Sequence, residues 1–360
     1  MPKREERRLQ LTGGSTYIVS LPKWWIRNLG LGKGDPVALI PQPGGGLLVL
    51  PASGEPRGIQ RGVLEVQPLE DPEEVFRKFL AMYLAGYDTI EVRIGEGATE
   101  LRSHLKDLMR RKLVGVEVID ETQSSMTASC LLRYSELPLK SVVERMHTLS
   151  SLMIQDALKA VLEGDDALAR DVAQRDDDVD RLYFLSVRQL KSAISNPAVA
   201  GELGLTNLRE ALGYRLVAKS LERIADHATS IAQAEFLVGK FPEGLSDGLQ
   251  EFGSMALNVV DESVRALGSM DERLALRAID LSRDVIKYEE RLTDQAFRLG
   301  ATSAIAVAGV KLVLESVRRI AEYGSDIAEV VMNMAADRGM SSLPAQEAAP
   351  RASGRTQRLI

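Results

Sequence analysis

Cysteine, histidine and long apolar runs are scarce in this sequence, and each absence excludes a class of protein. Cys130 is the only cysteine among 360 residues, so no intrachain disulfide can form and secretion gains no support. Its neighbours Met126 and Leu131 predict a small core residue rather than a catalytic thiol. The longest apolar run, 304–310, is far shorter than the ~20 residues that cross a bilayer. The first residues lack the apolar core of a signal peptide, so we expect a cytoplasmic protein without direct membrane insertion.

The residues that catalysis requires are also few. The three histidines stand beside no recognisable serine or cysteine motif, so nucleophilic catalysis has no support. No glycine-rich phosphate loop is present. A di-iron oxidase in a helical bundle needs two inward Glu-x-x-His pairs, and this chain has one, Glu144 with His147. We therefore expect no enzyme and no organic cofactor, with a metal-dependent oxidase as the weakest alternative.

The positive charge is concentrated at the N-terminal end. Residues 1–34 contain seven lysines and arginines against Glu5 and Glu6, although the whole chain has a net charge of -6. A basic segment on an acidic protein predicts a polyanion partner, and a solvated terminus is the alternative. The candidate contacts to DNA phosphates are Arg4, Arg7, Arg8, Lys23 and Arg27.

Residues 1–53 have the pattern of short strands and turns. Apolar and polar residues alternate on both sides of Gly13 and Gly14, a short helix follows Pro22, and strands are expected over 37–40 and 47–50. About fifty residues of this kind form too small a core to be stable alone, so the unit needs a second chain. Trp24 and its neighbouring tryptophan are expected in the core and dimer seam.

Residues 54–135 alternate between strand and helix patterns. Strands are expected over 63–66, 89–94 and 114–119, with amphipathic helices over 72–85 and 99–112. This order predicts a small α/β domain with a partly parallel sheet. The segment carries no recognisable chemistry and is expected to be a spacer or an interaction domain.

The rest of the chain contains two copies of one helical unit. The segment Ser220–Gln233 is echoed by Ser316–Glu329 with apolar and small residues in the same register. The first unit, 138–240, is expected to form helices over 138–163, 165–195 and 206–237. The second, 241–337, is expected to form them over 244–268, 271–300 and 303–337. Asp165 and Asp271 precede the middle helices, where acidic residues favour a helix start. Residues 338–360 lack periodicity and are expected to be a disordered tail.

Two stretches resemble known families. The stretch Thr12–Val37 is similar to the AbrB/SpoVT-type DNA-binding domain, a resemblance that implies a small barrel of swapped hairpins from two chains. The stretch Leu221–Ala228 closely resembles the signature of PhoU, the phosphate uptake regulator, and its unit is present twice. Archaeal-type regulators that join both parts are the most similar overall. The expected fold is therefore a swapped-hairpin β-barrel, a small α/β domain and a tandem of all-α three-helix bundles.

The PhoU resemblance also implies metal ligands. In that family, pairs of acidic residues four apart hold surface clusters of iron or another divalent or trivalent metal. The corresponding pairs here are Asp176 with Asp180, Glu222 with Asp226, Asp280 with Asp284, and Glu322 with Asp326.

The pattern itself leaves the metal open. Residues four apart lie on one helix face, so two carboxylates can share a hard cation, but an ordinary solvated face has the same pattern. A helical wheel places Glu222 and Asp226 toward solvent, with Glu322 and Asp326 nearly opposite the buried stripe. The second copy has Arg318 where the first has Glu222, so the two sites are not expected to be equivalent.

The resemblances together imply a regulator of phosphate uptake that forms a homodimer. It would bind DNA through the N-terminal domain, and its bundle would dock on the ATPase of a phosphate ABC transporter or on a phosphate-sensing kinase. The alternative is an interaction module that acts only on the transporter and does not bind DNA.

Overall fold

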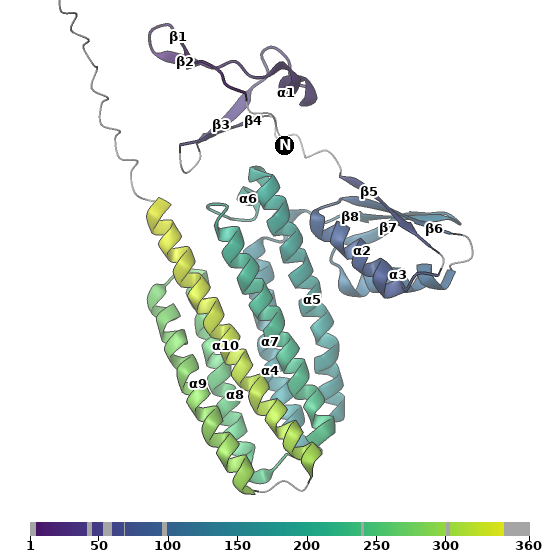
Figure 1. The fold of residues 1–360 in the computed structure, drawn as a ribbon, viewed down its shortest axis with the longest axis vertical. Coiled ribbons are helices and arrows are strands. Elements are labelled where there is room, and N and C mark those ends of the chain that lie inside the picture. The colour runs from purple at the N-terminus through teal and green to yellow at the C-terminus, as the bar shows by residue number, and fades with distance from the viewer. Residues whose placement is uncertain are drawn as a thin grey trace, which may run out of the picture. The chain divides into compact units, whose positions relative to one another are not determined.

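We describe the protein from a computed structural model. It covers residues 5–41, 45–52, 60–67, 69–95, 99–238, 241–299 and 303–341. The chain divides into two compact units, 1–58 and 59–360 (Figure 1). None of the helices in the covered ranges combines the length and the apolarity needed to span a bilayer.

The N-terminal unit contains two hairpins and one short helix. Strands β1 (Gln10–Thr12) and β2 (Thr16–Ile18) pair antiparallel, as do β3 (Val37–Pro41) and β4 (Leu47–Pro51), and α1 (Lys23–Asn28) lies between the hairpins in sequence. Gly13 and Gly14 have φ of 64° and 80°, a left-handed conformation that glycine adopts without strain. These elements confirm the predicted order of strands and helix.

No described residue of this unit is buried. Many of its large apolar side chains are exposed, including Leu11, Tyr17, Trp24, Leu39 and Leu47. A contiguous set of exposed apolar side chains marks an interaction surface. The undersized core predicted from the sequence is therefore present, while the two hairpins form two separate two-stranded sheets within one chain.

The second unit begins with a small α/β domain, which we call the middle domain. It consists of β5 (Arg61–Val66), α2 (Pro72–Ala85), β6 (Thr89–Ile94), α3 (Thr99–Lys112), β7 (Val116–Glu121) and β8 (Ser125–Cys130). The sheet order is β5-β6-β8-β7, with β5 and β6 parallel and β8 antiparallel to both neighbours. Leu64, Val66, Val92 and Met126 point to one buried face, which belongs to a hydrophobic core separate from that of the bundle. The sheet is partly parallel as predicted, but β8 was not expected.

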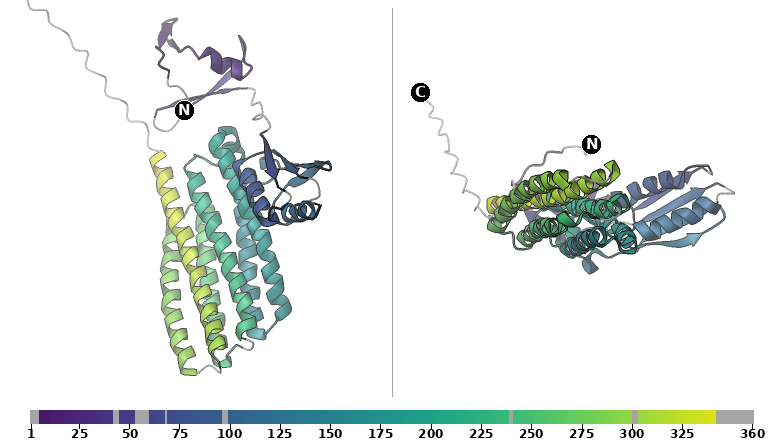
Figure 2. Two further views of the ribbon diagram at one scale, coloured as in Figure 1. Left: turned by 45° about the vertical axis from the view of Figure 1, so that its right-hand side comes forward. Right: turned by 90° about the horizontal axis from the view of Figure 1, so that it is seen from below.

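The remaining residues form one helical bundle. The long helices are α4 (Leu139–Glu163), α5 (Asp166–Ser195), α7 (Glu210–Val238), α8 (Glu243–Ser269), α9 (Glu272–Leu299) and α10 (Ala304–Ser341). They run alongside one another (Figures 1 and 2). Each repeat contributes three of them, so the duplicated architecture is confirmed. A short helix, α6 (Pro197–Glu202), lies in the first repeat between α5 and α7. Helix α10 also continues to Ser341, into the predicted tail, and residues 342–360 lie outside the described ranges.

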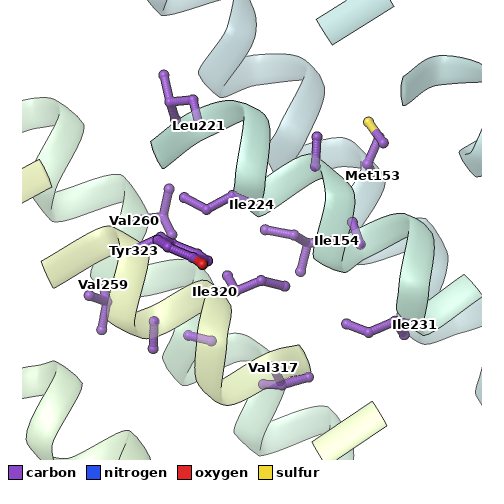
Figure 3. Packing of buried hydrophobic residues seen from close by; sticks show 14 of the residues in the cluster. Met153, Ile154, Leu221, Ile224, Ile231, Val259, Val260, Val317, Ile320 and Tyr323 are labelled. Atoms are coloured by element: carbon purple, nitrogen blue, oxygen red, sulfur yellow. The ribbon is translucent and has the colours of Figure 1, made fainter. Parts of the chain in front are cut away.

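The two repeats share one core. Helix α7 packs against α10 across the junction, and α4 also contacts α8. Ile224 and Ile231 from α7 lie near Val317 and Ile320 from α10 (Figure 3). The small residue Gly324 lets α10 approach α8: a Cβ atom there would lie 3.0 Å from Val259 Cγ1.

Candidate functional site

The predicted ligands of the first repeat come together on helices α5 and α7. Partial burial, and then the charges of Asp180 and Asp226, raise the pKa of Asp176 to about 7. Partial burial, and then the charges of Glu222 and Asp180, raise the pKa of Asp226 to about 6. Oδ1 of Asp176 is buried and has no hydrogen-bond partner among the described residues. The four carboxylates therefore form one electrostatically interacting group.

The position of Glu222 corrects the helical wheel. The wheel placed this residue toward solvent, but only 9% of it is exposed, whereas Asp226 is exposed as a residue although its surroundings partly desolvate its carboxylate. Helix α7 packs against α4, α5 and α10, so much more of its circumference is covered than a single buried stripe suggests.

Basic side chains already contact this acidic group. Lys219 forms an ion pair with Glu222. Lys112, the last residue of α3 in the middle domain, forms an ion pair with Asp177 and lies 3.2 Å (Nζ to Oδ2) from Asp180. Burial alone would lower the pKa of Lys112, but the hydrogen bond to Asp177 and the charges of Asp180 and Asp177 outweigh it and raise the pKa.

The predicted ligands of the second repeat are arranged differently. Asp280 and Asp284 are exposed on α9, and each pairs with a basic residue three positions on: Asp280 with Arg283 at 2.7 Å and Asp284 with Lys287 at 3.1 Å. Such exposed pairs contribute little to stability.

Glu322 and Asp326 instead line a groove of about 440 Å³ that neither Asp280 nor Asp284 lines. Glu322 forms ion pairs with Arg318 and Arg319, and Arg318 also lies 3.3 Å from Glu289. Burial, and then the charge of Glu329, raise the pKa of Asp326. The expected inequality of the two repeats is therefore present in their charges.

The donors as placed do not fit a shared metal ion. In the part of the chain that the structure describes, no three histidine, cysteine or acidic side chains are grouped so that they could hold one. Two of the four predicted ligands in the first repeat, Asp180 and Glu222, are engaged by lysines. A hard cation needs several oxygen ligands at once, so these contacts would have to be broken first.

The histidines provide no oxidase site. His147 Nε2 lies 2.7 Å from Asp261 Oδ1, while Glu144 lies 3.9 Å from Lys140. His227 stacks on Tyr323, with ring centroids 5.7 Å apart. The Glu-x-x-His pair found in the sequence is therefore divided between two different ion pairs.

The predicted DNA contacts lie in the N-terminal unit. Arg8, Lys23 and Arg27 are exposed and form no ion pair with any residue that the structure describes. Arg7 pairs with Glu5, and Arg4 lies outside the described residues. Three exposed guanidinium or ammonium groups thus remain available for phosphate contacts.

Sequence reasoning missed two basic residues, Lys112 and Arg188, that connect the middle domain to the bundle. Arg188 on α5 is buried, with a side chain only 2% exposed, and Nη1 donates hydrogen bonds to the carbonyl oxygens of Tyr83 (2.7 Å) and Tyr87 (2.8 Å). One indication was available: Asp177, Arg181 and Arg188 lie on one face of α5 at helical spacing, although such a stripe is usually solvated.

Comparisons with known proteins match two parts of the chain. A family model described as "PhoU domain" matches residues 143–234 and 249–331, and one described as "Antidote-toxin recognition MazE, bacterial antitoxin" matches residues 10–57.

Curated proteins and a solved structure are also similar to part of this chain. A "Phosphate-specific transport system accessory protein PhoU homolog" from Pseudomonas aeruginosa is 24% identical over 200 residues, which cover 54% of this chain and 81% of the relative. A homolog 1 of the same description from Thermotoga maritima is 26% identical over 209 residues, which cover 56% and 88%. The crystal structure of PhoU from Pseudomonas aeruginosa has 22% sequence identity and a TM-score of 0.49, with 56% of this chain and 96% of that chain covered.

Proposed function

Because this chain is a distant PhoU homologue, with a tandem PhoU domain behind an N-terminal MazE/AbrB-type domain, we propose that it is a regulator of phosphate transport that also binds DNA. The observation that carries the proposal is the presence of both domain types in one chain. The relatives are named as accessory proteins of a phosphate-specific transport system, and in our proposal this chain likewise catalyses no reaction.

The surface of the N-terminal unit supports DNA binding by a dimer. Its apolar side chains are exposed, so we propose that a second copy covers them and that the paired hairpins form a barrel. Arg8, Lys23 and Arg27 would then be present twice, and their charge supplies the salt-dependent part of DNA affinity. Replacing Leu11, an exposed strand residue, with Glu should halve the mass measured by light scattering. An unchanged mass would place the dimer contact elsewhere.

DNA binding is tested by titrating the full chain with duplexes from promoters of phosphate transport genes and with random duplexes, at several salt concentrations. Reversing the charge of Arg8, Lys23 and Arg27 to Glu should weaken binding and lower the salt slope by about 0.9 for each phosphate that is no longer neutralised. A matched control reverses Arg145, Lys191 and Arg273, three exposed basic residues of the bundle. Promoter affinity equal to random-duplex affinity, and equal in both sets of variants, would contradict DNA regulation.

We assign the second half of the proposed function to the bundle. The PhoU tandem would dock on the ATPase of the phosphate transporter or on a phosphate-sensing kinase. Co-purification of the full chain with each candidate separates the two partners. If the charge-reversed variant still regulates phosphate uptake normally, the chain acts only by docking and the DNA part of the proposal fails.

Our proposal does not depend on a metal ion. Iron or another metal on the acidic faces was expected from the family resemblance alone. Lysines and arginines pair with Asp180 and Glu222 in the first repeat and with Glu322 in the second, whereas Asp176 and Asp226 form no ion pair with any described residue.

A further inference from the structure

One face of α5 is covered by the middle domain along about three helical turns. Asp177, Arg181, Phe184 and Arg188 are spaced so that they lie on one side of the helix. Both α2 and α3 contact α5. Phe184 packs against the core of the bundle and also against the core of the middle domain. The two parts therefore meet in a defined interface with polar contacts at each end.

The contact at one end is buried. Besides the two carbonyl oxygens, Arg188 Nη2 donates to Asp88 Oδ1 at 3.2 Å, and the guanidinium carbon lies 4.9 Å from the ring centroid of Tyr83. The acceptors belong to the last turn of α2 and the segment that leads into β6. A guanidinium group that satisfies several acceptors in a fixed geometry forms a specific and durable anchor.

The contact at the other end is ionic and partly exposed. The last turn of α3 is basic, and its Lys112 pairs with Asp177 and Asp180, while Arg111 lies 4.0 Å from Asp177. Arg181 of α5 reaches back to the carbonyl oxygen of Leu113 at 3.5 Å. The side chain of Lys112 is 25% exposed, so solvent and salt reach it, unlike Arg188.

We propose that the acidic face of the first repeat is a docking surface for the basic end of α3, with Lys112 as its counter-cation in place of a metal ion. Like-charged carboxylates on neighbouring positions need compensation, and Lys112 places a positive charge on two of them. A metal ion would need the carboxylate oxygens of Asp180, one of the predicted ligands, so it and the ammonium group exclude one another there. The middle domain is thus held to α5 by the buried contacts of Arg188 at one end and by the ion pairs of Lys112 at the other.

The two contacts differ in how they respond to salt. The ion pairs of Lys112 are partly exposed, so salt weakens them more than the buried contacts of Arg188, because the Debye length falls from about 10 Å at 0.1 M to about 3 Å at 1 M. The end of the interface near Lys112 should therefore loosen more at high ionic strength than the end near Arg188.

The inference is tested by hydrogen exchange of the full chain carrying Lys112→Met. Amides in the last turn of α3 should exchange roughly two- to fivefold faster than in wild type, as expected for loss of a partly exposed ion pair. Lys106→Met is the matched control, because Lys106 lies on the same helix and pairs with Glu121 inside the middle domain. Lys112→Arg should restore wild-type exchange of this turn.

Treatment with a chelator distinguishes an interface held by Lys112 from one held by a metal ion. Treating the wild-type protein with EDTA should leave exchange of the last turn of α3 unchanged, and elemental analysis should find no stoichiometric metal lost. Faster exchange after EDTA, or equal exchange in the Lys112→Met and Lys106→Met variants, would overturn the inference. Neither measurement depends on regulatory activity, so failure of the proposed function would not affect it.

Discussion

Replacing Arg188 with methionine should uncouple the middle domain from the bundle. The substitution keeps an unbranched side chain of similar length but removes the charge and every donor. The carbonyl oxygen of Tyr87 would lose its donor, while that of Tyr83 would lose one donor but keep the backbone N–H of Gly86 at 3.0 Å. Asp88 would lose an ion pair, but it is partly exposed, so water can solvate its carboxylate and the carbonyl oxygen of Tyr87 determines most of the cost.

The expected loss of stability follows from these contacts. An unsatisfied buried acceptor costs about 1–3 kcal/mol. The contact of the guanidinium group with the Tyr83 ring adds about 0.5–2 kcal/mol. We therefore expect Arg188→Met to destabilise the interface by about 1.5–5 kcal/mol, the sum of one unsatisfied acceptor and the lost contact with the ring. Arg188→Lys keeps the charge but not the forked geometry, and its effect should be intermediate.

The assay must resolve the two parts, because a chain with several domains need not unfold in one step. Hydrogen exchange during a urea titration reports α2 and α5 separately. In the variant, α2 should lose protection at lower urea than α7, whereas in wild type they should unfold closer together. Arg145→Met, at an exposed position of α4, is the control and should change stability by no more than about 0.5 kcal/mol. A shift of α2 no larger than this control would refute the reasoning.

Two further predictions concern the bundle. Because the pKa of Asp176 is raised from 3.8 to about 7, the folded state binds a proton more tightly than the unfolded state, and stability falls as pH rises from about 4 to about 7. Asp176→Asn should therefore be more stable than wild type at pH 8, by at most on the order of 4 kcal/mol and by less where solvent screens the half-buried carboxylate. The difference should vanish near pH 4 in thermal unfolding, and equal stability at pH 8 would contradict it. Gly324→Ala should lower the free energy of unfolding in urea by about 1–2 kcal/mol. Alanine favours helix, but the added Cβ atom would lie too close to the Val259 side chain and the Val260 backbone. A gain in stability would mean that α8 can move aside.

The helices could be predicted from the sequence because their information is local. The apolar period continues for many turns, and the predicted starts at Asp165 and Asp271 are genuine caps. Asp165 accepts hydrogen bonds from two backbone amides at 3.0 Å, and Asp271 accepts them from the backbone amides of Arg273 at 2.8 Å and Leu274 at 3.4 Å. A long amphipathic pattern with an identifiable cap fixes a helix to within a few residues.

Strand β8 and helix α6 were missed because their signals are weak or distant. Ser125–Cys130 has only a short alternation, in which Met126 and Ala128 are buried, and it forms a strand by pairing with both β6 and β7. Pairing of this kind depends on neighbours far away in the sequence, which a local window cannot include. Helix α6 is only six residues long and interrupts what the sequence presents as a loop.

Only part of the candidate site could be predicted, because spacing along one helix is local information. Spacing identified carboxylates that share a helix face, and Asp176, Asp180, Glu222 and Asp226 do interact. It could not identify what covers them, since Lys112 lies 68 residues before Asp180 in another domain. A wheel describes one helix against one neighbour, so it also misplaced the buried Glu222.

The two repeats obtain their positive charge from different sources, and this difference bears on what each face can do. Arg318 stands where the first repeat has Glu222, and it neutralises Glu289 and Glu322 within the second repeat itself. The first repeat instead takes Lys112 from the middle domain, which follows the N-terminal unit in the sequence. A partner that competes for Asp177 or Asp180 would therefore release one end of the middle domain, whereas a partner bound at the second repeat would leave it latched.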